Sequence, residues 1–315
     1  MIASVPAMSS RFASFALQCS MAAMMIGCGG GGGEVCTMDS QCASHFCRAD
    51  GTCGPVESDG NSGSDGSGSG SGDAGMMGLC TPNHDGTISA NEVPLAAGKM
   101  ANYRIATSAT WNTTGTASGS TRTWDLTGAL SNDTDTPVAL QAPAGTWWAN
   151  DSGFASATYW TTLQAGSDLI GVFHVDSTGV TLLGVVSPTG SYPYTEITYS
   201  PPAKILAVPY KAADTWTSSS TVSGYVSGSV VNYTEKYVSN VDQTGTMKTP
   251  YGDFPVLRVG TVLTQAVINT TSVYRTVRSY AWTAECFGTV ASATSTDNET
   301  NAEFSNDAEV RRLIP

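Results

Sequence analysis

From Leu79 to Pro315 the chain consists of short runs in which β-branched or aromatic residues alternate with polar ones, and turn residues separate these runs. Alternation with a period of two places one face of a strand in a core and the other face in solvent. Between Lys99 and Ala293 there is no helical pattern. We therefore expect an all-β domain, built as a large curved antiparallel sheet (a half-barrel) or as a sandwich, because open sheet edges invite aggregation.

Several strands can be placed from this pattern. Residues 168–175 and 180–186 predict a hairpin around the turn 176–179, in which Gly179 supplies the left-handed conformation. A further strand has Leu257, Val259, Thr261 and Leu263 on one face. A longer strand is predicted over 274–286. One face would carry Tyr274, Tyr280, Trp282 and Cys286, and the other Val273, Arg275, Val277 and Thr283.

The composition narrows the classes of partner. Charged residues make up only 13% of the chain, and the net charge is −12 with the 14 Lys and Arg residues scattered. That charged share is about half of the usual one. Nucleic acid and anionic lipid need clustered cations, so we expect no nucleic-acid partner. A hydroxylated, acidic surface suits an exported protein and fits cations, water or carbohydrate. The alternative is that the charge serves solubility alone.

The N-terminus has the pattern of a secretory signal. Arg11 precedes an apolar stretch that begins at Phe12 and is interrupted by polar residues. Such a stretch is too short to span a bilayer, and it matches the apolar region of a signal peptide. Met8 offers a second start that keeps this signal intact, and the sequence leaves open whether Met1 or Met8 is used.

The apolar stretch ends in Met25-Ile26-Gly27-Cys28. Ile26-Gly27-Cys28 resembles the lipobox of bacterial lipoproteins, with Met25 at a position where Leu is usual. The resemblance implies cleavage before Cys28 and acylation of its thiol. It therefore implies a membrane anchor in the cell envelope, in the outer membrane, with the periplasmic or surface face left open.

The composition changes along the chain and predicts five parts. The Gly/Ser-rich part cannot bury enough apolar surface to order itself, so we expect a disordered linker there. The predicted parts are a signal peptide (1–27), a lipid-anchored tether (28–35), a cysteine-rich disulfide unit (36–53), the linker (54–78) and the antiparallel β domain (79–315).

The cysteine-rich unit contains an even set of cysteines with five, four and five residues between them, namely Cys36, Cys42, Cys47 and Cys53. In an exported chain this set predicts two disulfides with three alternative pairings. A zinc site favours pairs separated by two to four residues, and only Cys42 and Cys47 approach that spacing. The unit resembles the short cysteine-rich repeats that are common in surface lipoproteins of Gram-negative bacteria.

Cys80 and Cys286 remain in the β domain once Cys19 leaves with the signal and Cys28 is acylated. In an oxidising compartment the simplest prediction is that Cys80 and Cys286 form a disulfide. The alternative is a pair of buried thiols.

Residues 81–92 resemble an EF-hand calcium loop. Gly86, Ile88 and Glu92 occupy its sixth, eighth and twelfth positions. The resemblance implies calcium ligands at Asn83, Asp85, Thr87, Ser89 and Glu92. Thr81 stands where Asp is usual and Pro94 interrupts the downstream helix, so the expected affinity is weak, at roughly 0.1–1 mM. The alternative is a glycine turn followed by a capping box from Ser89 to Glu92.

The segment 245–259 contains a Pro250-Tyr251-Gly252 turn followed by Leu257-Arg258-Val259. It resembles a segment of exported bacterial β proteins similar to the periplasmic lipoprotein-carrier fold. That fold is a curved antiparallel sheet wrapped like half a barrel. The resemblance implies a fold and a concave apolar face, without implying carrier activity.

The sequence gives little indication of catalysis. The sequence has no Gly-x-Ser-x-Gly elbow, no His-Glu-x-x-His and no phosphate loop. His174, within a predicted strand, is more typical of a structural residue than of a general base. The pairs Trp147-Trp148 and Tyr159-Trp160 fit either a sugar-stacking platform or a core.

The sequence thus favours a membrane-anchored lipoprotein that acts as a non-enzymatic binding or structural module, with an apolar or carbohydrate ligand. The alternatives are a carrier of an apolar ligand in a concave sheet and a secreted hydrolase.

Overall fold

The computed structural model describes residues 80–119 and 121–315. The predictions for the signal peptide, the lipidated Cys28, the tether, the four-cysteine unit and the linker lie outside these residues. Of the described residues, 58% are in strands and 3% in helices, which confirms the all-β prediction. No helix in this part of the chain combines the length and apolarity needed to cross a membrane.

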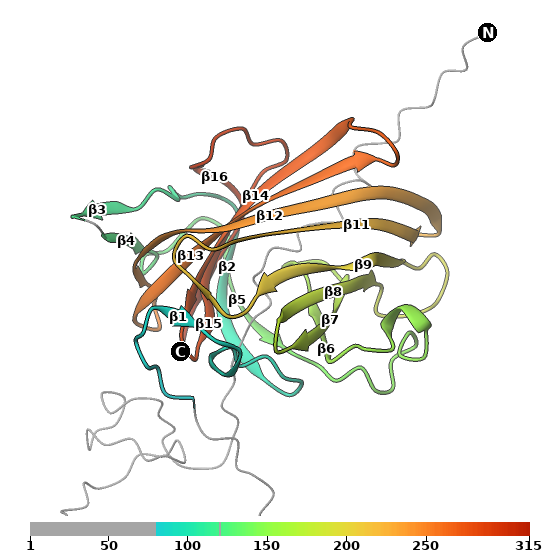
Figure 1. Ribbon diagram of the computed structural model, residues 1–315, viewed down its shortest axis with the longest axis horizontal. Helices are drawn as coiled ribbons and strands as arrows, with labels where there is room; N and C mark the ends of the chain where they lie inside the picture. Colours follow the sequence, from blue (N-terminus) through green and yellow to red (C-terminus); the bar gives the residue numbers. More distant parts are fainter. Residues whose placement is uncertain (1–79, 120) are drawn as a thin grey trace, which may run out of the picture. The chain divides into compact units, whose positions relative to one another are not determined.

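Sixteen strands and two 3-10 turns follow one another in this region (Figure 1). They are β1 (Thr87–Ile88), η2 (Ala90–Glu92), β2 (Met100–Thr110), β3 (Thr116–Ser118), β4 (Thr121–Asp125), β5 (Asp133–Ala139), η3 (Ser152–Phe154), β6 (Tyr159–Thr162), β7 (Ile170–Asp176), β8 (Gly179–Val186), β9 (Glu196–Ala207), β10 (Tyr210–Lys211), β11 (Thr215–Val226), β12 (Ser229–Lys248), β13 (Asp253–Val267), β14 (Val273–Ala284), β15 (Gly288–Ser295) and β16 (Asn306–Leu313).

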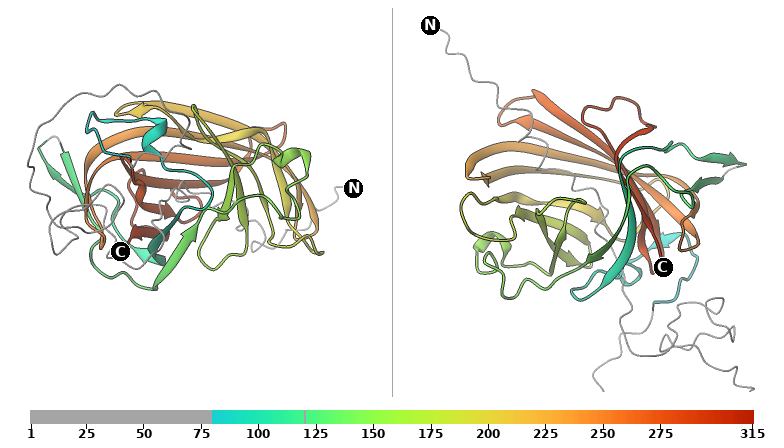
Figure 2. Two further views of the ribbon diagram at one scale, coloured as in Figure 1. Left: turned by 90° about the horizontal axis from the view of Figure 1, so that it is seen from below. Right: turned by 180° about the vertical axis from the view of Figure 1, so that it is seen from behind.

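Most strands belong to a single antiparallel sheet that curves strongly on itself (Figure 2). Its order is β5-β2-β16-β15-β14-β13-β12-β11-β9-β8-β7-β6. The two end strands meet through an antiparallel bridge, in which Gln141 and Trp160 exchange backbone hydrogen bonds of 2.8 and 2.9 Å. The sheet is therefore a nearly closed barrel, which confirms the predicted large curved antiparallel sheet. The sandwich, which was the alternative prediction, is not the architecture observed.

Short strands attach to this barrel. β4 runs parallel to the C-terminal part of β12, with Gly245 opposite Arg122, and β3 pairs with β4. β1 and β10 form a separate two-stranded sheet, in which Ile88 lies opposite Tyr210. β4 thus pairs with the part of β12 that β11 does not reach.

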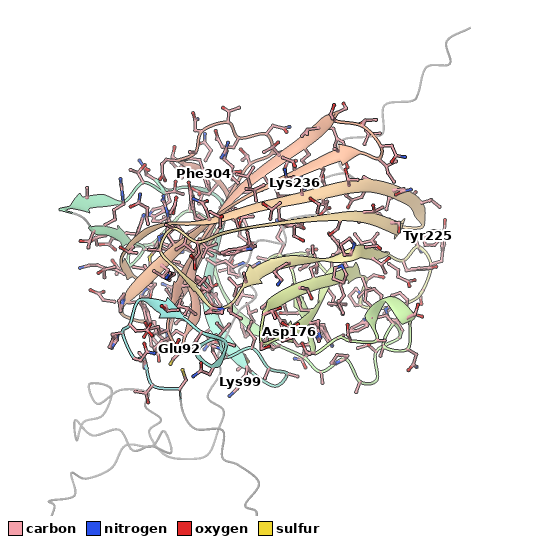
Figure 3. All side chains as sticks on the ribbon, viewed as in Figure 1. Glu92, Lys99, Asp176, Tyr225, Lys236 and Phe304 are labelled. Atoms are coloured by element: carbon pink, nitrogen blue, oxygen red, sulfur yellow. The ribbon has the colours of Figure 1, made fainter. Side chains whose placement is uncertain are left out.

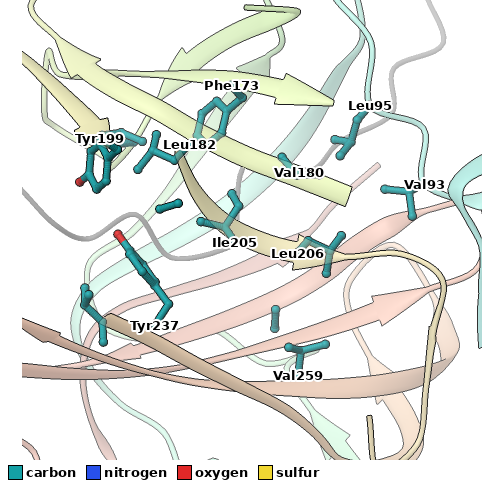
Figure 4. Packing of buried hydrophobic residues seen from close by; sticks show 14 of the residues in the cluster. Val93, Leu95, Phe173, Val180, Leu182, Tyr199, Ile205, Leu206, Tyr237 and Val259 are labelled. Carbon is teal, nitrogen blue, oxygen red and sulfur yellow. The ribbon is translucent and has the colours of Figure 1, made fainter. Parts of the chain in front are cut away.

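Alternating residues send apolar side chains to both faces of the sheet. On β13, Leu257, Val259 and Leu263 belong to the inner cluster, whereas Phe254 and Val256 belong to an outer one. Figure 4 shows part of the inner cluster, where Tyr199 of β9 and Tyr237 of β12 extend toward one another. A smaller outer cluster lies where η3 covers β7 and β8, with Phe154 against Ile170 and Val172.

Most of the sequence-based strand predictions hold, but Val273 and Arg275 do not share a face as predicted, because a bulge places them opposite the consecutive residues Ala266 and Gln265. The hairpin of β7 and β8 forms, and Gly179 has a φ of +142°. A Cβ there would lie 2.0 Å from the carbonyl oxygen of Leu206, so the close approach of β9 also requires glycine. The strand predicted to reach Cys286 ends at Ala284 instead, because Cys286 lies in a turn with a φ of +66°. The chain also contains η3 in a region where no helix was expected.

Candidate functional site

The loop that resembles a calcium site is an Asx-type turn. Asn83 accepts the backbone N–H of Asp85 over 2.9 Å, and Asp85 accepts that of Thr87 over 2.7 Å. Gly86 has a φ of +77°, as expected for the sharp turn at that position. Two of the five residues that were predicted to bind calcium, Asn83 and Asp85, thus already order the backbone of the turn.

The second half of this loop forms the capping box that was the alternative prediction. The Oε2 atom of Glu92 accepts hydrogen bonds from the backbone N–H of Ser89 over 2.9 Å and from its hydroxyl over 2.6 Å. Glu92 is buried. Within residues 80–119 and 121–315, no group of three or more acidic, histidine or cysteine side chains could hold a metal ion. Calcium binding by this loop stays a prediction.

The loop packs against the turn that follows β14. His84 donates its backbone N–H to Glu285 over 2.7 Å, and Cys286 donates its own to the carbonyl of Glu92 over 2.9 Å. Cys80 and Cys286 are both disulfide-bonded. Their pairing with each other stays a prediction.

The inner face of the barrel carries a row of polar side chains on four adjacent strands. The strand register places Ser220 opposite Glu235, Glu235 opposite Gln265, and Gln265 opposite Arg275. Directly opposite residues point to the same face of a sheet. These four residues, which we call the polar row, are all buried.

Glu235 lies at the centre of a phenol-rich environment. It accepts a hydrogen bond from the Tyr237 hydroxyl over 2.7 Å and one from the Gln265 side-chain amide over 3.1 Å. Burial raises the pKa of Glu235 to about 7, although the hydrogen bonds from Tyr237 and Gln265 act in the opposite direction. Burial also raises the pKa of the neighbouring Tyr233 well above its ordinary value. This carboxyl therefore exchanges its proton near neutral pH.

Two members of the polar row have hydrogen-bonding capacity that the described protein does not use. The Ser220 hydroxyl and the Nη1 atom of Arg275 are buried and make no hydrogen bond within residues 80–119 and 121–315. The rest of the Arg275 guanidinium pairs with Asp297 over 2.8 Å. Buried polar groups normally have partners, so these two donors mark a place where an acceptor would be stabilised.

The tryptophan and tyrosine pairs singled out in the sequence divide between core and surface. Trp148 and Tyr159 are fully buried, so the hypothesis that both pairs form a sugar-stacking platform is wrong for these two. Trp147 is only partly buried and lies on the outer face, with its indole N–H donated to the carbonyl of Ser187 over 2.9 Å. Trp160 is also partly buried and donates to the carbonyl of Ala142.

His174 lies on β7 beside two oxygen atoms. Its Nδ1 atom is 2.6 Å from the carbonyl oxygen of Ser156, and its Nε2 atom is 3.8 Å from Asp176. A serine nucleophile would need its hydroxyl at the imidazole. Here the serine contributes its backbone carbonyl, so this contact does not form a nucleophile–base pair.

Sequence reasoning did not single out the polar row. The alternation Tyr233-x-Glu235-x-Tyr237 places a carboxyl between two phenols on one face of a strand, and this pattern could have indicated the row. The partners of Glu235 on β11, β13 and β14 depend on strand register, which the sequence alone does not reveal.

No protein-family model and no curated protein sequence matches this chain. Among solved structures, a similar chain is a candidate lipoprotein from Parabacteroides distasonis. The two share 9% identity over 74% of this chain and 95% of that chain, with a TM-score of 0.23. A likeness this low carries no argument about function.

Proposed function

We propose that this protein is an exported, membrane-anchored lipoprotein whose β domain binds an amphiphilic ligand on the inner face of the barrel. The ligand has a long apolar chain and a head group that accepts hydrogen bonds. The observation that carries this proposal is the polar row, which lies on the same face of the sheet as the apolar side chains of the inner cluster. The anchor rests on the lipobox-like Ile26-Gly27-Cys28.

The number of strands supports a ligand inside the barrel. Along its main path the described sheet has twelve strands. Eight strands enclose a space that side chains fill or that holds one small ligand, and the diameter grows roughly in proportion to strand number. On this relation a sheet of twelve strands can enclose a wider space than a barrel of eight strands.

The inner face supplies contacts for an apolar chain. It carries aromatic and aliphatic side chains from β6 to β14, and Tyr159 stacks on Phe173 with their rings 5.0 Å apart. Burying apolar ligand surface against such side chains stabilises a complex by about 25 cal/mol per Å². An acyl chain fits this surface better than a compact polar molecule does.

The polar row selects the head group. Two groups of the polar row have no protein partner among the described residues, and both of them, the Ser220 hydroxyl and Nη1 of Arg275, are donors. Glu235 is half protonated near pH 7, and in that form it is also a donor. A carboxylate is an acceptor that satisfies all three, so a long-chain fatty acid is the ligand class that fits best.

Binding can be tested on the full-length protein with a fluorescent long-chain fatty acid. We expect saturable binding that becomes at least tenfold weaker in Arg275→Gln. Arg278→Gln is the matched control, because Arg278 lies on the same strand with its register partner Val262 on the outer face. Circular dichroism checks that each variant is folded.

The outcomes separate the alternatives. No saturable binding to the wild type, or an equal loss in Arg275→Gln and Arg278→Gln, would overturn the ligand proposal. Equal affinity for a long-chain alcohol and for the fatty acid would show that the polar row does not recognise the carboxylate. The protein would then be a carrier that binds only the apolar chain.

The anchor has its own test. Mass spectrometry of the mature N-terminus should find an acylated Cys28, and Cys28→Ser should release the protein from membranes, because a lipid chain is the anchor that this proposal requires. A mature chain that keeps residues before Cys28, or carries a free thiol there, would exclude lipidation.

A further inference from the structure

Four aromatic side chains gather on the outer side of the barrel where β9 and β11 lie next to the β11–β12 hairpin. Trp147 packs edge-on against Tyr194, with ring centroids 5.7 Å apart, and Tyr194 lies 5.9 Å from Tyr225. Tyr192 is 78% exposed and Tyr225 is 42% exposed. Figure 3 labels Tyr225 near this end of β11. We call Trp147, Tyr192, Tyr194 and Tyr225 the aromatic platform.

Glycine backbone holds two of these rings in place. A Cβ on Gly190 would lie 3.0 Å from the Trp147 ring, and one on Gly228 would lie 2.5 Å from the Tyr192 ring. The hydrogen bond from the Trp147 indole to the carbonyl of Ser187 fixes its orientation further. The Trp147 ring is therefore held in one orientation before any ligand arrives, which lowers the entropic cost of binding to it.

Acidic groups lie next to the platform. Glu196 is directly opposite Tyr225 in the register of β9 and β11, so both side chains point to the same face. Burial raises the pKa of Glu196, and the nearby charge of Asp151 raises it further. Glu196 is partly exposed and can accept hydrogen bonds from a ligand.

The neighbouring outer surface is rich in hydroxyls. Two residues before Tyr225 on β11, Ser223 lies opposite Thr198, and Thr221 follows opposite Ser200. These residues extend the face that bears Tyr225 and Glu196 along the strands. The surface thus combines exposed aromatic rings with carboxylate and hydroxyl groups.

We infer that the aromatic platform is a binding site for a neutral carbohydrate chain. A sugar ring presents a face of C–H groups that packs on Tyr and Trp rings, and a rim of hydroxyls that bond to carboxylates and to Ser and Thr. A purely apolar partner would make no hydrogen bonds with Glu196 or with the Ser and Thr hydroxyls of β9 and β11. An anionic polymer would be repelled by Glu196 and Asp151.

Affinity electrophoresis of the full-length protein tests this site. The gels contain cellulose-, xylan-, mannan- or β-1,3-glucan-type neutral polysaccharides, and we expect retardation by at least one of them. Tyr225→Ala and Tyr192→Ala should each weaken that binding at least tenfold. Val238→Ala is the control, because Val238 is 42% exposed on the outer face of β12 and lies away from the platform.

The possible results decide the proposal. Lack of retardation in every gel, or retardation that Tyr225→Ala leaves unchanged, would overturn it. Sedimentation would also overturn it if the wild type formed a dimer that Tyr225→Ala dissolved, because the platform would then be a contact between copies. Tyr225→Ala should keep wild-type fatty-acid binding, so this test and the test of the proposed function fail independently.

Discussion

The hydroxyl of Tyr237 donates a 2.7 Å hydrogen bond to the carboxyl of Glu235, two residues earlier on the same face of β12. Both side chains are about 1% exposed. The pair places a titratable group inside the barrel, where its protonation state depends on a pKa of about 7. The stability of the fold and the chemistry of the inner face are therefore linked to pH.

The first prediction concerns this linkage. The pKa of Glu235 is about 7 in the folded protein, against an ordinary value of 4.5. Between these values the folded state binds more protons than the unfolded chain, so the free energy of unfolding falls as pH rises. The loss for Glu235 is at most about 3.5 kcal/mol, since one pKa unit corresponds to about 1.4 kcal/mol. Asp307, with a pKa raised by burial to about 7, acts in the same direction.

Urea unfolding of the wild type and Glu235→Gln at pH 5 and pH 8 measures this effect. We expect a smaller difference between the two pH values in Glu235→Gln. Asp168→Asn, at an exposed position, should keep the wild-type difference. Identical pH dependence in the wild type and Glu235→Gln would contradict the prediction.

A second prediction concerns Arg258. Its buried guanidinium forms two-bond pairs with both Asp242 and Glu303, and lies 4.0 Å from the centroid of the Tyr280 ring. Removing one partner of such a pair leaves carboxylates without their counter-charge, so Arg258→Ala should lower the free energy of unfolding by about 3 kcal/mol. Arg258→Lys should recover little, because an ammonium cannot reproduce the forked geometry.

The exposed pair of Arg104 and Asp135 is the control for Arg258. It also has two hydrogen bonds, of 2.6 and 2.9 Å, but solvent screens it. Arg104→Ala should therefore leave the unfolding midpoint close to that of the wild type. A loss as large as that of Arg258→Ala would show that burial does not govern the strength of these pairs.

A third prediction is that Cys80 and Cys286 are bonded to each other. Peptide mapping without reduction should find one fragment that contains both cysteines. A disulfide that closes a loop of this size contributes up to about 4–5 kcal/mol in the chain-entropy model. The double variant Cys80→Ser, Cys286→Ser should therefore have a clearly lower melting temperature. A bond from Cys80 to any cysteine of the unit 36–53 would refute the pairing.

A fourth prediction separates the capping role of Glu92 from calcium binding. Because Glu92 accepts two hydrogen bonds from Ser89, Glu92→Ala should lower stability by about 1 kcal/mol in the presence of a chelator, whereas Glu92→Gln keeps an acceptor oxygen and should lower it less. Calorimetry of the wild type with calcium up to a few millimolar tests the metal. Saturable heat that Glu92→Gln abolishes would support the weak site, and no heat would leave the loop as a capped turn.

The sequence by itself determined the fold class and several strands. Period-two alternation reports which residues share a face, and it correctly grouped Leu257, Val259 and Leu263 on the inner face of β13. The capping box was also readable, because its contacts join Ser89 and Glu92, only three residues apart. Alternation does not report where a strand ends, which is why the strand before Cys286 was predicted to be too long.

Tertiary structure alone decided the candidate sites. Ser220, Glu235, Gln265 and Arg275 form one row only because four strands pair in one register, and a shift by one residue would turn each side chain to the other face. Tyr194, between β8 and β9, contacts both Trp147 in the loop before η3 and Tyr225 at the end of β11. Local patterns describe one strand at a time, whereas burial, the pKa of Glu235 and the aromatic platform arise from contacts between segments far apart in the chain.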